Sequence, residues 1–116
     1  MKKYLYILIT IIIMPVISFC HPASDVQLQY DIEKQEIVVV ISHSVRNPND
    51  HYIYDIEVLL NNKKIVKQSA YSQINNKEQK FVYLIHGLKY NDKIKIIADC
   101  NKGGKIKRSF VIEKTE

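Results

Sequence analysis

Three histidines and one cysteine are the residues of this 116-residue chain whose types and spacing could do chemistry. His43 and His51 stand on either side of an Asn-Pro turn, and Cys100 precedes a short segment that ends in two glycines. His21 lies before the first predicted strand. Imidazole nitrogens and a thiolate are strong ligands for transition metals. The pattern therefore predicts a mononuclear metal site made of His21, His43, His51 and Cys100.

The donor set leaves the identity of the metal open. Neutral imidazoles with one thiolate suit iron(II), zinc or copper, and the thiolate would shift the redox potential of a redox-active metal. Hydrolytic chemistry is not indicated. Ser42 and Ser44 flank His43 on the chain, but neighbours on a strand point to opposite faces. The sequence also contains no glycine-rich phosphate loop and no metalloprotease motif.

Each candidate ligand also has a plain structural interpretation. An isolated histidine near a turn is usually a partly exposed polar residue, and we interpret His86 in this way. Cys100 could be a buried thiol that packs as a small hydrophobe, or it could form a disulfide with Cys20. Metal ligation is favoured because two histidines and a cysteine are all expected at strand ends.

The elements that would hold these side chains are predicted to be β-strands. Apolar and polar residues alternate with a period of two, and no segment has a convincing helical pattern. The run from Ile37 to Ile41 is typical of a central strand covered on both sides. Turn signals about every 8–12 residues indicate an immunoglobulin-like antiparallel β-sandwich of seven or eight strands. The predicted strands are 25–31, 36–42, 51–60, 65–66, 81–85, 93–100 and 105–113, and 71–79 is predicted to be a loop.

This arrangement predicts that the ligands meet at one pole of the sandwich. His43 ends the most apolar strand and His51 begins the next one, so antiparallel neighbours joined by the turn would bring the two rings together. Cys100 ends its own strand before a glycine turn. Strand ends gather at the two poles of a sandwich, and these three residues are expected to share one pole.

Residues 1–20 are predicted to be a secretory signal peptide, with Ser18 as an alternative last residue. Two lysines precede an apolar run that ends in proline and small residues, and this run is shorter than the ~20 residues of a transmembrane helix. The protein is therefore expected to be exported to the periplasm or secreted. Association with a membrane is expected only if Cys20 is lipidated. Residues 21–116 are predicted to form one domain.

Composition argues against nucleic acid as a partner. Removing Lys2 and Lys3 with the leader lowers the formal net charge from +5 to +3. The remaining charges alternate with apolar residues, as on a solvated strand face, and do not form a basic groove. The eight tyrosines mostly occupy strand positions and are interpreted as core or cross-strand residues.

The sequence resembles the iron-binding domain of the superoxide reductase/desulfoferrodoxin family. The resemblance rests on His21-Pro22, on Asn47-Pro-Asn-Asp-His51-Tyr-Ile53, and on Cys100-Asn101 followed by Gly104, in that order along the mature region. It implies an immunoglobulin-like sandwich with one non-haem iron, held by four histidines in a plane and an axial cysteine thiolate. The iron(II) reduces superoxide to peroxide. By resemblance, Cys100 is the axial ligand, and His51 and His21 are histidine ligands.

The chain departs from the family pattern at three points. Gly103 stands where the family has its fourth histidine, and His43 lies further from the Pro-Asn turn than the corresponding ligand. The acidic-Lys pair that precedes the first histidine of the family, and whose lysine attracts superoxide, is absent.

Three interpretations follow from these departures. The first is a superoxide reductase-type oxidoreductase that uses superoxide and an electron-donor protein. The second is a copper- or zinc-binding carrier or sensor without turnover, in which cleavage after Cys20 would give His21 a free amine that helps to chelate copper. The third is a metal-free secreted sandwich that binds a protein partner. The sequence leaves the oligomeric state open.

Overall fold

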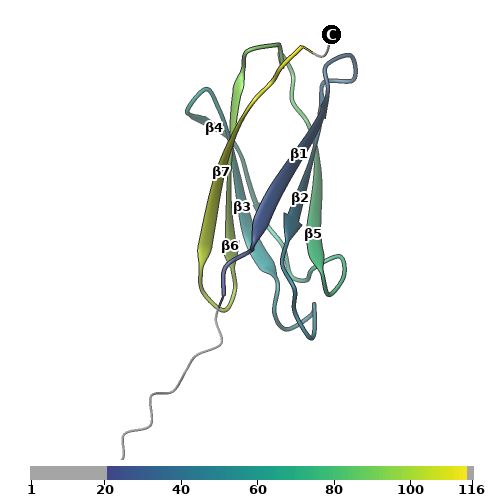
Figure 1. The fold of residues 1–116 in the computed structure, drawn as a ribbon, viewed down its shortest axis with the longest axis vertical. Helices are drawn as coiled ribbons and strands as arrows, with labels where there is room; N and C mark the ends of the chain where they lie inside the picture. The colour runs from purple at the N-terminus through teal and green to yellow at the C-terminus, as the bar shows by residue number, and fades with distance from the viewer. Residues whose placement is uncertain (1–20, 115–116) are drawn as a thin grey trace, which may run out of the picture.

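The computed structural model describes residues 21–114 of the chain, which form seven β-strands and, within that range, no helix (Figure 1). The predicted signal peptide and its Cys20 lie outside the described residues. Within residues 21–114 there is also no helix long and apolar enough to cross a membrane. The strands are β1 (Asp25–Asp31), β2 (Glu36–Ser42), β3 (Ile53–Leu60), β4 (Lys63–Ser69), β5 (Glu78–Leu84), β6 (Lys93–Cys100) and β7 (Lys105–Val111).

The strands form two antiparallel sheets, with the orders β1-β2-β5 and β4-β3-β6-β7. The sheets face each other as the two layers of a sandwich (Figure 1). The space between them is filled by aliphatic side chains, of which the largest fully buried ones are Ile37, Val39, Ile41, Ile53, Ile56, Val58, Ile94, Ile96 and Ile112. The predicted fold class, an immunoglobulin-like antiparallel β-sandwich, is confirmed.

The apolar run of β2 is central in its sheet, as predicted, but it is not covered equally on both faces. Ile37, Val39 and Ile41 have no exposed surface, whereas Val38 and Val40 are half-buried. The second face is open because, within residues 21–114, no further layer packs on the outer side of the β1-β2-β5 sheet. A β-branched run is therefore compatible with one-sided burial in a central strand.

Strand β3 has an irregular sequence pattern because it contains a β-bulge. The pairing of β3 with β6 shifts between Ile53 and Asp55, so Tyr54 is an extra residue in the strand. Ile53 and Ile56 are both buried although three positions separate them, and Tyr54 is exposed. The bulge thus turns the apolar side chain at the start of the strand back to the core, beside the segment that carries His51.

Several element boundaries differ from the predictions. Strand β4 extends well beyond 65–66, and β5 begins at Glu78 rather than at residue 81. Strand β3 begins at Ile53, so His51 lies before the strand and not in it, and β7 ends at Val111 rather than at residue 113. The start of β5 is not evident from the sequence pattern, because Gln79 is a polar residue at a buried position and makes its hydrogen bonds to backbone groups. The hairpin between β3 and β4 is confirmed, with Asn61 and Asn62 both at positive φ, as a two-residue turn requires.

Strand ends from both sheets meet at one pole of the sandwich, where the described part of the chain also begins (Figure 1). The first residue of β1 pairs with the last residue of β2, and the first residue of β3 pairs with Cys100, the last residue of β6. Strands β2 and β3 lie in different sheets, so the expectation that they are hydrogen-bonded neighbours is wrong. Their connection crosses between the layers and still brings residues 43 and 51 to the same pole.

Candidate metal centre

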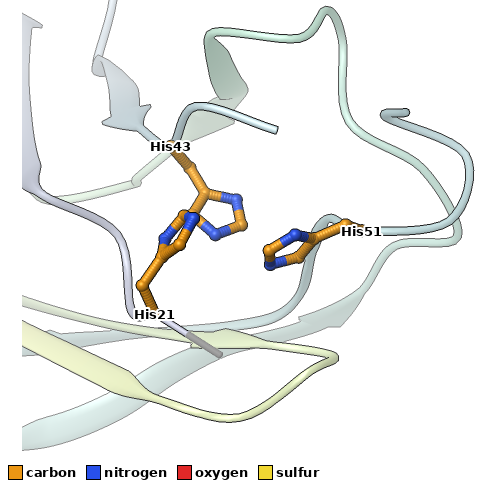
Figure 2. Close-up of side chains that lie close together, drawn as sticks. All are labelled: His21, His43 and His51. Carbon is orange, nitrogen blue, oxygen red and sulfur yellow. The ribbon is translucent and has the colours of Figure 1, made fainter. Parts of the chain in front are cut away.

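Three imidazole rings from separate segments meet at this pole (Figure 2). One ring nitrogen from each of His21, His43 and His51 lies within 4.8 Å of the corresponding atoms of the other two. The ring centroids are 5.1 Å apart for His21 and His43, 5.1 Å for His21 and His51, and 4.8 Å for His43 and His51. Three ligands around one metal ion would stand about 3–4 Å apart for metal–nitrogen bonds of about 2.1 Å. The cluster is therefore close to the dimensions of a metal site.

His43 is the buried member of the cluster, with 1% of its surface exposed. It follows β2, and its backbone amide donates to the carbonyl of Lys77, which extends the sheet contact past the last strand residue. Its Nδ1 atom lies 2.8 Å from Oε1 of Gln73. Because an amide oxygen only accepts hydrogen bonds, Nδ1 carries the proton and donates.

The other ring nitrogen of His43, Nε2, is buried and has no hydrogen-bond partner among the residues that the structure describes. A buried acceptor without a partner costs about 1–3 kcal/mol, so such atoms call for an explanation. A role of His43 as a metal ligand explains the missing partner of Nε2, since ligating histidines commonly donate their other N–H to a fixed acceptor and direct the bare nitrogen at the metal.

His51 lies beside the candidate thiolate. Its Nε2 atom is 3.0 Å from Sγ of Cys100, which is buried at the end of β6. The two atoms are in hydrogen-bond contact, and they are close enough together to ligate one metal ion.

Asn101 holds the His51 segment against the end of β6. Its side chain accepts a hydrogen bond from the amide of Tyr52 (2.9 Å) and donates one to the carbonyl of Asp50 (2.8 Å). Its own amide donates to the carbonyl of Tyr52 (3.0 Å). These three bonds surround His51 in the sequence and fix its backbone next to Cys100. These bonds explain structurally why an asparagine follows Cys100.

His21 is exposed and reaches the cluster because the N-terminal segment lies against the turn between β6 and β7. Gly104 in that turn has φ +101°, and a Cβ atom there would stand 2.7 Å from the backbone nitrogen of Pro22. Real Cβ atoms do not approach backbone so closely, so the contact requires glycine. Gly104 therefore permits the position of His21-Pro22.

Burial and nearby charges favour the neutral form of His51. The pKa of His51 is lowered from its usual value of 6.5, first by burial and then by the neighbouring His43 and His21. Lys102 lowers this pKa further, whereas Asp50 raises it. Lys102 and Asp50 themselves form an ion pair at 3.2 Å. A neutral ring keeps a lone pair available for a metal near neutral pH.

The structure thus brings together three of the four predicted ligands, His21, His43 and His51. Cys100 contacts His51 but is not part of the group whose ligand atoms all lie within 4.8 Å of one another. His86 is exposed, as predicted. Gln73 could not be identified from the sequence, because a glutamine in a polar loop has no distinguishing local pattern. Asn101 is part of the Cys-Asn motif, but the sequence does not indicate its role.

A surface pocket of about 530 Å³ lies next to the thiol of Cys100. Tyr52, Tyr54 and Tyr71 line part of its wall. Tyr71 is 87% exposed and Tyr54 is 41% exposed, so the interpretation of the tyrosines as core or cross-strand residues is wrong for these two. The exposure of each residue has a local cause. Tyr54 is the extra residue of the bulge, and Tyr71 lies in the loop after β4.

A comparison with solved structures gives a clear likeness in fold. The chain is similar in fold to a superoxide reductase. The structure concerned is the superoxide reductase (1Fe-SOR) from Giardia intestinalis, with a TM-score of 0.59 and 15% sequence identity. The alignment covers 78% of this chain and 98% of that one. No family model matches the sequence, and no curated protein matches it. At this identity the likeness shows the architecture, and the site chemistry rests on the residues themselves.

Substitution of Gly104 by alanine tests the placement of His21. The new Cβ would displace Pro22, so Gly104→Ala should lower the affinity for Co(II) to the level of His21→Ala. The double variant should lose no more than either single one, because both changes remove the same ligand. Titration calorimetry measures all three.

Gly87→Ala is the matched control, because Gly87 has φ +82° and a Cβ atom added there would meet nothing within 4 Å beyond its chain neighbours. It should cost about 1–3 kcal/mol of stability from backbone strain, as Gly104→Ala should, but leave the Co(II) affinity unchanged. Equal affinity losses in the two alanine variants would show that strain, and not the contact with Pro22, is responsible.

Proposed function

We propose that this protein is an exported, mononuclear non-haem iron protein that reduces superoxide to peroxide. His21, His43, His51 and Cys100 would hold the iron. The observation that carries the proposal is the bare Nε2 atom of His43, buried within a cluster of three imidazoles beside a thiol. The likeness in fold to a superoxide reductase supports the same conclusion.

The donor set fits iron. Three imidazoles and a thiolate would leave one or two positions free on a five- or six-coordinate ion, where superoxide could bind. Zinc in a closed structural site prefers a tetrahedron. When bound, iron(II) would supply the single electron that superoxide needs. The reaction consumes one electron and two protons for each superoxide and gives one hydrogen peroxide, so an electron-donor protein must return the electron.

The surrounding residues supply orientation and charge. Gln73 fixes the His43 ring, and Asn101 fixes the backbone around His51. Lys102 is the lysine whose charge lowers the pKa of His51, and it forms an ion pair with Asp50 at 3.2 Å. Attraction of an anion to the site is therefore weaker than an unpaired lysine would provide. We expect capture of superoxide to be slower than in family members that carry the acidic-Lys pair and the fourth histidine.

The stoichiometry of peroxide tests the reaction. Iron(II)-loaded protein is mixed with limiting superoxide, and peroxide is measured together with oxidation of the iron. A reductase gives one peroxide for each superoxide consumed and oxidises one iron. A dismutase gives one peroxide for every two superoxides and leaves the iron oxidation state unchanged over a cycle. Absence of any reaction above the protein-free rate would contradict the proposed activity.

Metal analysis of the protein isolated from its native compartment separates iron from the alternatives. Iron at about one equivalent supports the proposal. Copper or zinc at that level, with no reaction toward superoxide, would support a carrier or sensor instead. A metal-free protein that also fails to bind added iron, zinc or copper would leave the interpretation as a binding sandwich.

Export is tested by the mass of the protein made with its leader in a bacterium. The protein should be recovered outside the cytoplasm and lack residues 1–18 or 1–20. A diacyl mass on Cys20 would show a lipid-anchored form. Intact protein starting at Met1 in the soluble cytoplasmic fraction would contradict export without bearing on the metal site.

A further inference from the structure

We infer that Gln73 is a positioning residue that sets the tautomer of His43 and directs its bare nitrogen at the metal. The inference rests on the proposed metal site, but the tautomer itself is a property of the metal-free protein. Gln73 belongs to the loop between β4 and β5, far in sequence from His43, and 5% of its surface is exposed.

The orientation of the Gln73 amide is fixed by its own hydrogen bonds. Its Nε2 atom donates to the backbone carbonyl of His43 at 2.7 Å and to that of Asn75 at 3.1 Å. Reversing the amide would point an oxygen at both carbonyls, which would repel it. The Oε1 atom must therefore face the ring of His43.

The orientation of the amide decides the protonation of the ring. Oε1 accepts from Nδ1 of His43 at 2.8 Å, so the proton of the neutral imidazole resides on Nδ1. The lone pair is then on Nε2, which is buried and has no partner among residues 21–114. In the opposite tautomer, Oε1 of Gln73 and Nδ1 of His43 would both be acceptors and would repel at this distance.

Gln73 also connects the two segments that carry the candidate ligands. Its backbone amide donates to the carbonyl of Pro48 at 2.9 Å, and its Oε1 lies 3.4 Å from the amide of Ile53. Pro48 and Ile53 bracket the segment that contains His51. One glutamine thus contacts the His43 ring, the His43 backbone and both ends of the His51 segment. The position of the Gln73 loop and the relative positions of His43 and His51 therefore depend on each other.

The choice of a neutral acceptor has a chemical consequence. An amide oxygen accepts the Nδ1–H bond of His43 without carrying a full charge. A carboxylate in this place would make the ring a stronger donor and would stabilise the oxidised form of a metal. Glutamine therefore orients the ring while leaving its donor strength moderate.

The first test reads the tautomer in metal-free protein. Long-range proton–nitrogen NMR correlations, recorded at about pH 8 so that the rings are neutral, should show the His43 proton on Nδ1 in the wild type. A proton on Nε2 in the wild type would overturn the inference without any variant. Gln73→Glu keeps an acceptor for Nδ1–H and should keep this tautomer, even though it loses the two donated bonds. A proton on Nε2 in this variant would also count against the inference.

The second test removes the acceptor. Gln73→Met keeps the length of the side chain, and His43 should lose its preference for the Nδ1 proton. Affinity for Co(II), measured by calorimetry, should fall about 10–100-fold, the usual effect of removing such an outer partner.

The matched control for this variant is Gln79→Met. Gln79 is buried near the same loop and bonds to Ser72, Ile53 and Ile74 but not to His43. This control should lower stability while preserving the tautomer and, within about threefold, the affinity. Unchanged tautomer and affinity in folded Gln73→Met would overturn the inference. If wild-type protein has the expected tautomer but binds no metal, the proposed function fails, whereas the conclusion that Gln73 sets the tautomer of His43 stands.

Discussion

Replacing Cys100 by serine is expected to abolish the visible absorption of the oxidised iron-loaded protein. A thiolate donates charge to iron(III) or copper(II) and gives a charge-transfer band, whereas a serine hydroxyl is a poor and weakly polarisable ligand. Cys100 is buried and its sulfur lies 3.0 Å from a ring nitrogen of His51, so the thiolate would be the only soft donor among the four proposed ligands. Absorption spectroscopy of wild-type and Cys100→Ser protein at equal iron content measures the effect.

Two histidine variants serve as a second test and as a control. His51→Ala removes the ring that contacts the thiol and should strongly lower metal occupancy. His86→Ala is the control and should change neither the band nor the occupancy, because His86 is exposed and apart from the cluster. A protein that retains its full metal content in both Cys100→Ser and His51→Ala would falsify the proposed metal site. A band that survives in Cys100→Ser alone would assign the absorption to other ligands.

Metal binding is expected to raise the melting temperature of the domain by about 10–20 °C. A ligand present at 100 times its dissociation constant stabilises the folded state by about 2.7 kcal/mol. For a domain of this size each kcal/mol corresponds to about 4–8 °C. The effect should be large here because the buried Nε2 atom of His43 gains a partner. Calorimetric scans with and without Co(II) or iron(II) test this under anaerobic conditions.

The stabilisation should depend on pH in a defined direction. The pKa of His51 is lower in the folded protein than the usual 6.5, so the unfolded chain binds this proton more readily. The contribution of neutral His51 to the free energy of unfolding is therefore fully present above pH 6.5 and is lost as the pH falls through the lowered pKa of the folded state. Bound metal excludes the proton from His51, so the metal-loaded protein should lose its extra stability over the same acidic range.

Controls for the thermal experiment follow from the same geometry. His86→Ala should melt and respond to metal like the wild type. His43→Leu removes the bare nitrogen and should lose most of the response to metal, whatever its own melting temperature. An equal metal-induced rise in the wild type and in His43→Leu would contradict the role of His43 as a ligand.

Much of the fold could be predicted from local sequence because the responsible forces are local. Alternation of apolar and polar residues assigns one face of each strand to the core, and this pattern located β1, β2 and β6 within a residue or two. Asn61-Asn62 predicted the hairpin because asparagine tolerates positive φ. The start of β5 could not be predicted in this way, since Gln79 faces the interior and satisfies its polar atoms with groups that the sequence does not reveal.

The meeting of the ligands was predictable in outline for a related reason. Strand ends gather at the poles of a sandwich. His43 directly follows β2, His51 lies two residues before β3, and Cys100 is the last residue of β6. The expectation that His43 and His51 belong to neighbouring strands of one sheet is wrong. They come from opposite layers, because the Asn-Pro connection crosses the sandwich instead of forming a hairpin.

The donor types, the strand periodicity and the turns follow from the sequence alone, because they depend on residue chemistry and on neighbours in the chain. Which nitrogen of His43 is bare does not follow from it, since that depends on Gln73, a residue 30 positions away. The need for glycine at position 104 is also a tertiary property, because the atom that excludes a side chain there belongs to Pro22. Contacts between distant segments form only when the sheets pack, and no local pattern encodes them.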